Sequence, residues 1–176
     1  NKKIDLKILD EFQNAAEECG IPKTNDFNTG DNTGIGFFQF TTNHNKSLLK
    51  LRCSAAKGYL NPVKKRKNLK IITNAHVQKI NFEGTKANSV SFYRGDELIT
   101  AKAKREIILS AGSIGSPHIL QVSGIGNADK LSKIGIKTIH ELKGVGMNLQ
   151  DHLMFRPVYK VKNLKSLNGK INSLFG

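Results

Sequence analysis

The segment 112–126 is the part of the chain whose residue types and spacing best suit binding chemistry. Its sequence is GSIGSPHILQVSGIG, and it follows the apolar run 106–110. Small residues between a buried strand and a helix let the backbone approach a ligand closely. Free N–H groups and the positive end of the helix dipole would favour an anion there. A tight turn whose glycines serve packing alone explains the same residues equally well.

The histidines and cysteines give weaker signals. The spacing of the five histidines matches no zinc site, so no metal is expected; they are His44, His76, His118, His140 and His152. The pair Asp151-His152 could do acid–base work or could fix a loop. Cys19 and Cys53 form no CxxC motif. We interpret them as two reduced thiols of an intracellular protein, with a disulfide as the alternative.

Several elements are expected to position the segment 112–126. A helix is expected over 8–19, because apolar residues recur every three or four positions and Gly20 can cap its end. The region 25–45 is rich in Asn, Gly, Thr and Asp, which predicts a long loop. Apolar patterns and turn signals predict helices over 54–62, 116–124 and 127–134, and strands over 69–77, 89–93, 106–110 and 136–140. A turn is expected at Glu83-Gly84, before the strand 89–93.

The strand 106–110 is a short continuous apolar run, which is typical of a strand buried on both faces. The helix after it is expected to begin at Ser116-Pro117, because proline at the first helical position loses no hydrogen bond. Asn127 is expected to cap the helix that follows. This mixture of strands and helices predicts an α/β or α+β sheet domain.

The charge is strongly positive, with 28 Lys and Arg against 14 Asp and Glu, a formal net charge of +14. Such a charge favours nucleic acid or an acidic membrane as partner. However, 23 of these residues are Lys and 5 are Arg, and Arg is the better residue for bidentate contacts to phosphate or guanine. The lysines are scattered, with the densest run at 64–67. We therefore interpret them as a solvated surface and expect no nucleic-acid partner.

The length of 176 residues allows one domain with a hydrophobic core. An apolar content of 38% excludes a low-complexity chain and wholesale disorder. The apolar runs fall far short of the roughly 20 residues that span a bilayer, so no transmembrane segment is expected. No apolar signal region follows the first residues. The chain begins with Asn1 rather than Met, which indicates a piece of a longer protein.

The segment 112–126 also resembles, position by position, the second signature of the glucose–methanol–choline (GMC) flavin oxidoreductases. That signature has two small residues, then Ser/Thr-Pro, two apolar residues and a final Ser-Gly-apolar-Gly. Five further regions are similar to the same family in the expected order: 25–28 with 34–41, 52–54 with 59–62, 68–80, 105–112 and 144–152.

The resemblance implies an α/β fold that belongs to an FAD-binding domain. Residues 1–152 would be the C-terminal half of that domain, with the loop 25–45 on the substrate side. Residues 153–176 would begin an α+β substrate domain.

The resemblance also implies an activity, the oxidation of a CH–OH group of choline or another primary alcohol. A base takes the hydroxyl proton and a hydride passes to the flavin, so the cofactor would be FAD. The electron acceptor would be oxygen, a quinone or a carrier. The protein would be cytoplasmic, or peripheral to the inner membrane. A small basic nucleic-acid-binding module and a non-catalytic family member are the alternatives.

Carried over by position, three residues would contact the cofactor. The backbone of Val77 would meet the adenine end of FAD, and Ala111 and Gly112 would form the close turn beside the adenosine. No G-x-G-x-x-G fingerprint for the pyrophosphate is present. We expect no catalytic residue in this chain, because the family's catalytic histidine lies in its C-terminal region. The fragment alone is therefore expected to be inactive.

Overall fold

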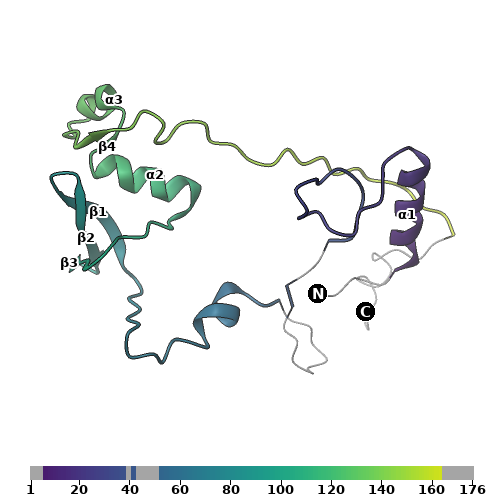
Figure 1. Cartoon of the computed structure of the whole chain (residues 1–176), viewed down its shortest axis with the longest axis horizontal. Helices are drawn as coiled ribbons and strands as arrows, with labels where there is room; N and C mark the ends of the chain where they lie inside the picture. Colours follow the sequence, from purple (N-terminus) through teal and green to yellow (C-terminus); the bar gives the residue numbers. More distant parts are fainter. Residues whose placement is uncertain (1–5, 39–40, 43–51, 164–176) are drawn as a thin grey trace. The chain divides into compact units, whose positions relative to one another are not determined.

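The computed structural model describes residues 6–38, 41–42 and 52–163 (Figure 1). The chain divides into two compact units. The first unit is Asn1–Leu69 with Arg156–Gly176, and the second unit is Lys70–Phe155.

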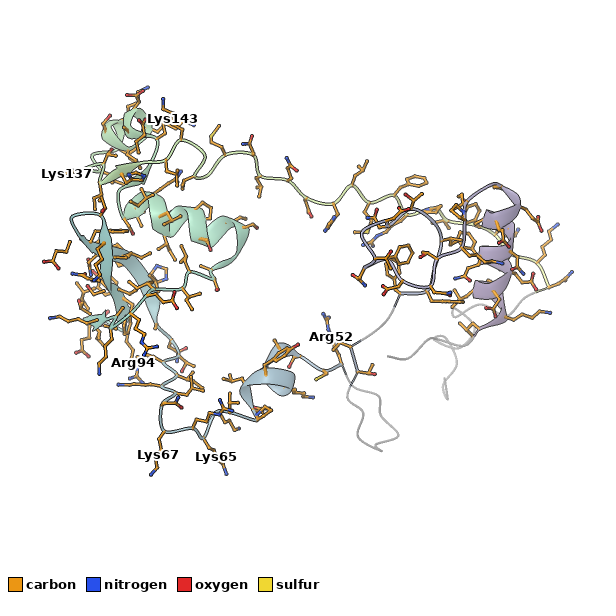
Figure 2. All side chains as sticks on the ribbon, in the orientation of Figure 1. Arg52, Lys65, Lys67, Arg94, Lys137 and Lys143 are labelled. Atoms are coloured by element: carbon orange, nitrogen blue, oxygen red, sulfur yellow. The ribbon has the colours of Figure 1, made fainter. Side chains whose placement is uncertain are left out.

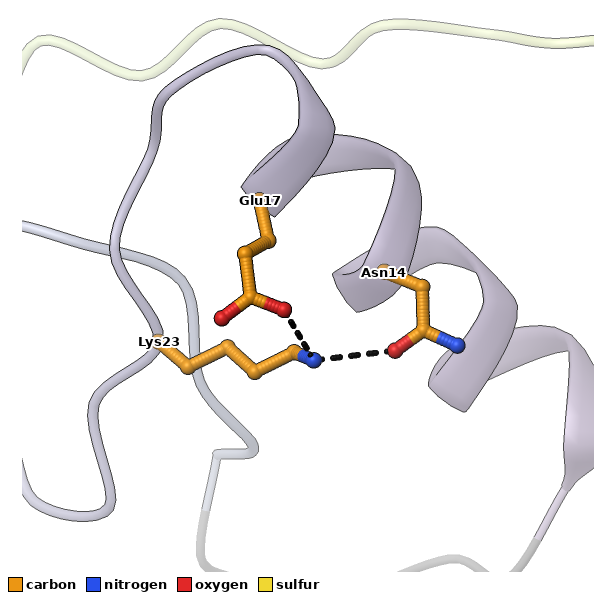
Figure 3. Close-up of polar contacts among 3 residues, drawn as sticks. All are labelled: Asn14, Glu17 and Lys23. Atoms are coloured by element: carbon orange, nitrogen blue, oxygen red, sulfur yellow. Dashed lines mark hydrogen bonds and ion pairs between the residues drawn. The ribbon is translucent and has the colours of Figure 1, made fainter.

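Helix α1, Lys7–Glu18, opens the described part of the first unit. It ends as expected: Gly20 adopts the left-handed conformation with φ 84°, which a residue without a side chain does at little cost. The predicted helix over 8–19 is confirmed. Lys23, in the segment after α1, forms hydrogen bonds to side chains of the helix (Figure 3). Its Nζ donates to Glu17 Oε2 at 2.7 Å and to Asn14 Oδ1 at 2.9 Å.

The chain after α1 forms a closed loop within the predicted loop region 25–45. Thr24 N donates to Ile35 O at 2.9 Å, and Ile35 N donates to Pro22 O at 2.8 Å. The two segments joined by these hydrogen bonds lie so close together that a Cβ on Gly36 would be 2.5 Å from Thr24 O. Inside the loop, Asp26 Oδ1 accepts hydrogen bonds from the backbone N of Asn28 at 2.9 Å and from its Nδ2 at 3.0 Å. Residues 39–40 and 43–45 lie outside the described part.

The helix predicted over 54–62 is present as the short π-helix η1, Ala56–Leu60. Ser54 stabilises its start, because the Ser54 hydroxyl accepts from the backbone N of Lys57 at 3.3 Å. Turns follow η1 through residue 65.

The second unit is built on a three-stranded antiparallel sheet of β1 (His76–Glu83), β2 (Lys86–Arg94) and β3 (Glu97–Lys102), in that order. The predicted strand 89–93 and the turn at Gly84 before it are confirmed. The predicted strand 69–77 is wrong over residues 69–75, because pairing begins only at His76, whose register partner is Tyr93 on β2. Strand β3 was not predicted.

The two faces of this sheet differ in chemistry. Register partners share a face, and one face carries apolar partners such as Phe92 with Ile99. The other face carries a polar ladder. Asn81 Nδ2 donates to the hydroxyls of Ser89 and Ser91, at 3.1 and 2.8 Å, and the Ser91 hydroxyl shares a 3.3 Å hydrogen bond with that of Thr100. Both serines are buried.

Helix α2, Gly112–Val122, contacts β1. The expectation that this helix begins at Ser116-Pro117 is wrong, because it begins at Gly112 and Pro117 lies inside it. The small residues before the proline allow the backbone to turn early. Pro117 is the sixth residue of α2, where it cannot donate to the carbonyl of Ser113 and its ring crowds that carbonyl.

The predicted strand 106–110 is also wrong, because the segment has no regular structure. Its Ile108 is 78% exposed. A strand of a parallel sheet is held by neighbours on both sides. None of the described residues pairs with this segment.

Helix α3, Ala128–Lys133, begins where Asn127 caps it, as predicted, with Lys130 N donating to Asn127 Oδ1 at 2.9 Å. Two short strands flank it: β4 (Ile125–Gly126) pairs in parallel with β5 (His140–Glu141). The predicted strand 136–140 is therefore correct only at its last residue.

The hydrophobic core of the described residues lies in the second unit. It consists of Ile80, Phe92, Ile125 and Leu131. The sheet and α3 contribute residues to this core, and α2 adjoins it. The core therefore holds together the elements around the segment 112–126. No helix in the described ranges is both long and apolar enough to cross a membrane.

Replacing the buried Leu131, which is 2% exposed, with alanine is expected to remove core packing beside Gly126. We expect Leu131→Ala to lower the free energy of unfolding by roughly 2–5 kcal/mol, measured by urea unfolding of the protein. The matched control is Ile134→Ala, one turn away and 68% exposed, which should change stability by less than about 0.5 kcal/mol. Equal effects of the two substitutions would contradict this core.

The Asp26 turn should depend on pH. The hydrogen bonds from the backbone and then the side chain of Asn28 lower the pKa of Asp26 below its ordinary value of 3.8. The contact is therefore intact above that value and is lost as the pH falls through the lower pKa of the folded state. In an NMR titration we expect the Asn28 amide signal to shift with a midpoint below pH 3.8. The Asp26→Asn variant, which cannot ionise, should show no such midpoint.

Candidate functional site

The three predicted site residues lie on two elements of the second unit that contact each other, β1 and α2. Val77 is the second residue of β1, is half-buried and pairs with Phe92. A bulge follows it, because the register shifts between Val77 and Lys79. Ala111 and Gly112 form the bend that starts α2.

The bend at Ala111-Gly112 is held by local geometry. Gly112 has φ 83°, a left-handed conformation that favours glycine. The N–H of Ala111 donates to the hydroxyl of Ser116 at 3.0 Å, so the first turn of α2 is closed by a side chain. The backbone bend is therefore fixed without any bulky residue.

The outside of this bend is open. A Cβ placed on Gly112 would meet no atom within 4 Å. Ala111 and Ser113 are exposed as well, and Ile114 is 73% exposed. Among the described residues, none covers the outer side of the bend, so the bend itself does not exclude a nucleotide there.

A groove of about 600 Å³ runs along the same helix. Its two walls are the residues 113–121 of α2 and the loop 144–149. Gln121 holds these walls together, because its Nε2 donates to Val145 O at 3.2 Å. Gly146 lies beside it with φ 76°, a conformation that favours glycine, and a Cβ there would displace the Gln121 amide, whose Nε2 would lie 2.5 Å away.

Gly124, near the other end of the segment 112–126, has a different structural role. Gly124 has φ 88°, and a Cβ on it would lie 2.7 Å from Lys137 O. The carbonyl of Gly124 accepts from Ile139 N at 2.8 Å, which brings the chain before β5 against this turn. Gly124 therefore serves packing, whereas no described atom lies within 4 Å of a Cβ placed on Gly112.

Ser123, the residue directly before Gly124, was not singled out by the sequence analysis. Its hydroxyl accepts from Ile80 N of β1 at 2.8 Å and donates to Ile119 O of α2. The residue is 4% exposed. The signal available in the sequence was its place directly before a helix-ending glycine, but its partner lies far away along the chain.

The histidines and cysteines form no reactive site in the described residues. Asp151 Oδ1 accepts from the backbone N of His152 at 2.8 Å, which is a loop contact. No group of His, Cys, Asp and Glu in the described ranges could hold a metal ion. Cys19 and Cys53 are both free, as predicted. His44 lies outside the described residues.

Basic side chains project from separate segments in each unit (Figure 2). In the second unit, Arg94 ends β2, while Lys137 and Lys143 lie on either side of β5. In the first unit, Lys65 and Lys67 follow η1. All five are exposed, which agrees with the solvated surface that the sequence predicts.

The chain is similar to much longer proteins. It is 42% identical over 153 residues to the oxygen-dependent choline dehydrogenase of Pectobacterium atrosepticum, a match that covers 87% of this chain and 27% of that protein. It is 43% identical to the mitochondrial choline dehydrogenase of Homo sapiens, covering 81% of this chain and 23% of that protein. The chain thus spans about a quarter of the length of these relatives.

Solved structures give the same fold. An FAD-dependent oxidoreductase from Chaetomium thermophilum matches with a TM-score of 0.72 and 34% identity, covering 81% of this chain and 24% of that one. Pyridoxine 4-oxidase from Mesorbium loti matches with a TM-score of 0.60 and 29% identity, covering 76% of this chain and 25% of that one.

The family model described as GMC oxidoreductase matches residues 3–154. This match and the solved structures confirm the predicted fold class, part of a GMC-type FAD-binding domain with mixed helices and sheets. The nucleic-acid-binding alternative is not favoured. The open bend, the ordered segment 112–126 and these matches lead to one conclusion: the chain belongs to the GMC oxidoreductase family.

Proposed function

We propose that the chain is part of an FAD-dependent enzyme that oxidises the CH–OH group of choline or another small primary alcohol. The family membership and the choline dehydrogenases among its relatives support this proposal. The single structural observation that carries it is the open backbone bend at Ala111-Gly112, which has left-handed geometry at Gly112 and free space beside it.

The residues that would hold FAD are Val77, Ala111 and Gly112. The backbone of Val77 on β1 would lie at the adenine, and the bend at the start of α2 would lie beside the adenosine. Helix α2 has 11 residues, so the N–H groups at its first turn add a favourable field for a polar or anionic group. When bound, FAD supplies the redox chemistry by accepting a hydride from the alcohol carbon.

The remaining parts of the site would come from the rest of a longer protein, since the chain covers 27% of the first of these relatives. We assign to that remainder the pyrophosphate-binding glycines and the base that takes the hydroxyl proton. We further propose that residues 1–152 belong to the FAD-binding domain and that 153–176 begin the substrate domain.

In this proposal, the substrate and the electron acceptor are inferred from the names of the relatives. Choline is favoured because both of the relatives described above are choline dehydrogenases, and one of them is named as oxygen-dependent. Oxygen is therefore the first acceptor to test, ahead of a quinone or a protein carrier. The location proposed is the cytoplasm, or the surface of the inner membrane.

The test is the visible spectrum of the full-length protein. The proposal expects a yellow protein whose flavin absorption is bleached by choline, or by a simple primary alcohol, when oxygen is absent. A colourless full-length protein would overturn it. A yellow protein that no alcohol bleaches would support the alternative of a non-catalytic family member.

The bend can be tested by one added methyl group. We expect Gly112→Ala in the full-length protein to weaken FAD binding by roughly tenfold, because the new Cβ occupies the proposed approach to the adenosine. FAD content per protein and titration of the apoprotein measure the effect. The matched control is Gly95→Ala, another positive-φ glycine with no neighbour within 4 Å, which carries the same backbone strain away from the site. Equal FAD affinity in both variants would contradict the assignment of Gly112.

A further inference from the structure

We infer that Ser123 is a positioning residue that holds the two FAD-contacting segments, at Val77 and at Gly112, in register with each other. The inference rests on the function proposed above, because it assumes that these two segments bind FAD. Ser123 itself lies at the C-terminal end of α2, away from the bend, and would touch no part of the cofactor.

The hydroxyl of Ser123 joins two elements by two hydrogen bonds. It accepts from the backbone N of Ile80 at 2.8 Å and donates to Ile119 O. Since the residue is 4% exposed, water does not compete for these bonds. Among the described residues, this is the hydrogen bond that links α2 to β1; the remaining contact between them is packing.

Each bond leads to one of the proposed cofactor contacts. Ile80 lies three residues after Val77 on β1, beyond the bulge at Gln78, so fixing Ile80 fixes the strand next to that irregular point. Ile119 belongs to the rigid body of α2, whose other end is Gly112. A helix of 11 residues transmits the position of its last turn to its first, about 16 Å away.

β1 is an edge strand of its sheet, which makes the Ser123 hydroxyl important. A backbone N–H on the outer side of an edge strand has no strand partner. Removing the hydroxyl would leave the buried N–H of Ile80 unpaired, and a buried unpaired donor is unfavourable. The strand and helix would then be held by apolar packing alone, which lacks the directional constraint of the hydrogen bond.

The experiment compares Ser123→Ala with Ser132→Ala in the full-length protein. Ser132 is a matched control because its hydroxyl also donates to a helix carbonyl, Asp129 O, at 3.0 Å, but it makes no bond to β1. Dissociation constants for FAD, ADP and FMN are measured on apoprotein at a temperature where near-UV circular dichroism shows a native spectrum. ADP reports on the adenosine half of the site, and FMN on the flavin half.

We expect Ser123→Ala to weaken FAD and ADP binding by about tenfold while leaving FMN binding unchanged, with Ser132→Ala equal to the wild type. Ser123→Thr, which keeps the hydroxyl, should restore most of the affinity. If Ser123→Ala does not fold, Ser123→Cys, whose thiol fills similar space and bonds weakly, should give the same pattern.

Two results would overturn the inference alone: unchanged ADP and FAD affinity in both the alanine and the cysteine variants, or an equal loss for all three ligands. The latter would mark a general loss of stability. A wild-type protein that binds neither FAD nor ADP would instead overturn the proposed function, and the inference with it, so the two failures are distinguishable.

Discussion

The hydrogen bond between the N–H of Ile80 and the hydroxyl of Ser123 is the constraint on which the arrangement of the second unit depends. Apolar contacts bring α2 and β1 together, but such contacts are non-directional. A buried hydroxyl with one donor and one acceptor partner fixes both the distance and the direction. The same short stretch of chain continues into Gly124, where the backbone meets Lys137 and Ile139. One helix end therefore contacts both the sheet, at Ile80, and the chain before β5, at Ile139.

The glycines of the segment 112–126 differ in their surroundings, although they belong to one motif. Gly112 leaves open space outside the chain, and Gly124 fills a crowded place where a side chain would strike a carbonyl oxygen. Both have left-handed backbone. A crowded glycine and an open glycine look identical in a sequence, so only the positions of neighbouring atoms identify Gly124 as a packing residue.

The sequence predicted the features that depend on nearby residues. The cap at Gly20, the turn at Gly84 and the cap at Asn127 each arise within a few positions, and all three are present. The strand 106–110 was wrong because strand pairing depends on neighbours in space, and the helix start at Pro117 was wrong because the chain already becomes helical at Gly112. The role of Ser123 was invisible for the same reason, since its partner Ile80 is 43 positions away. Family resemblance supplied the fold where local patterns did not.

The polar ladder across the sheet has a consequence for folding specificity. Asn81 reaches two serines on the neighbouring strand, and one of these continues to Thr100 on the third. If β1 slid by one residue against β2, its side chains would change faces. The polar groups of the ladder would then lie against Val90 and Phe92. The buried apolar face, with Ile80 and Phe92, already opposes such a shift, and the ladder adds to it. The ladder thus selects a single alignment, and it does so on the face opposite the one that packs the core.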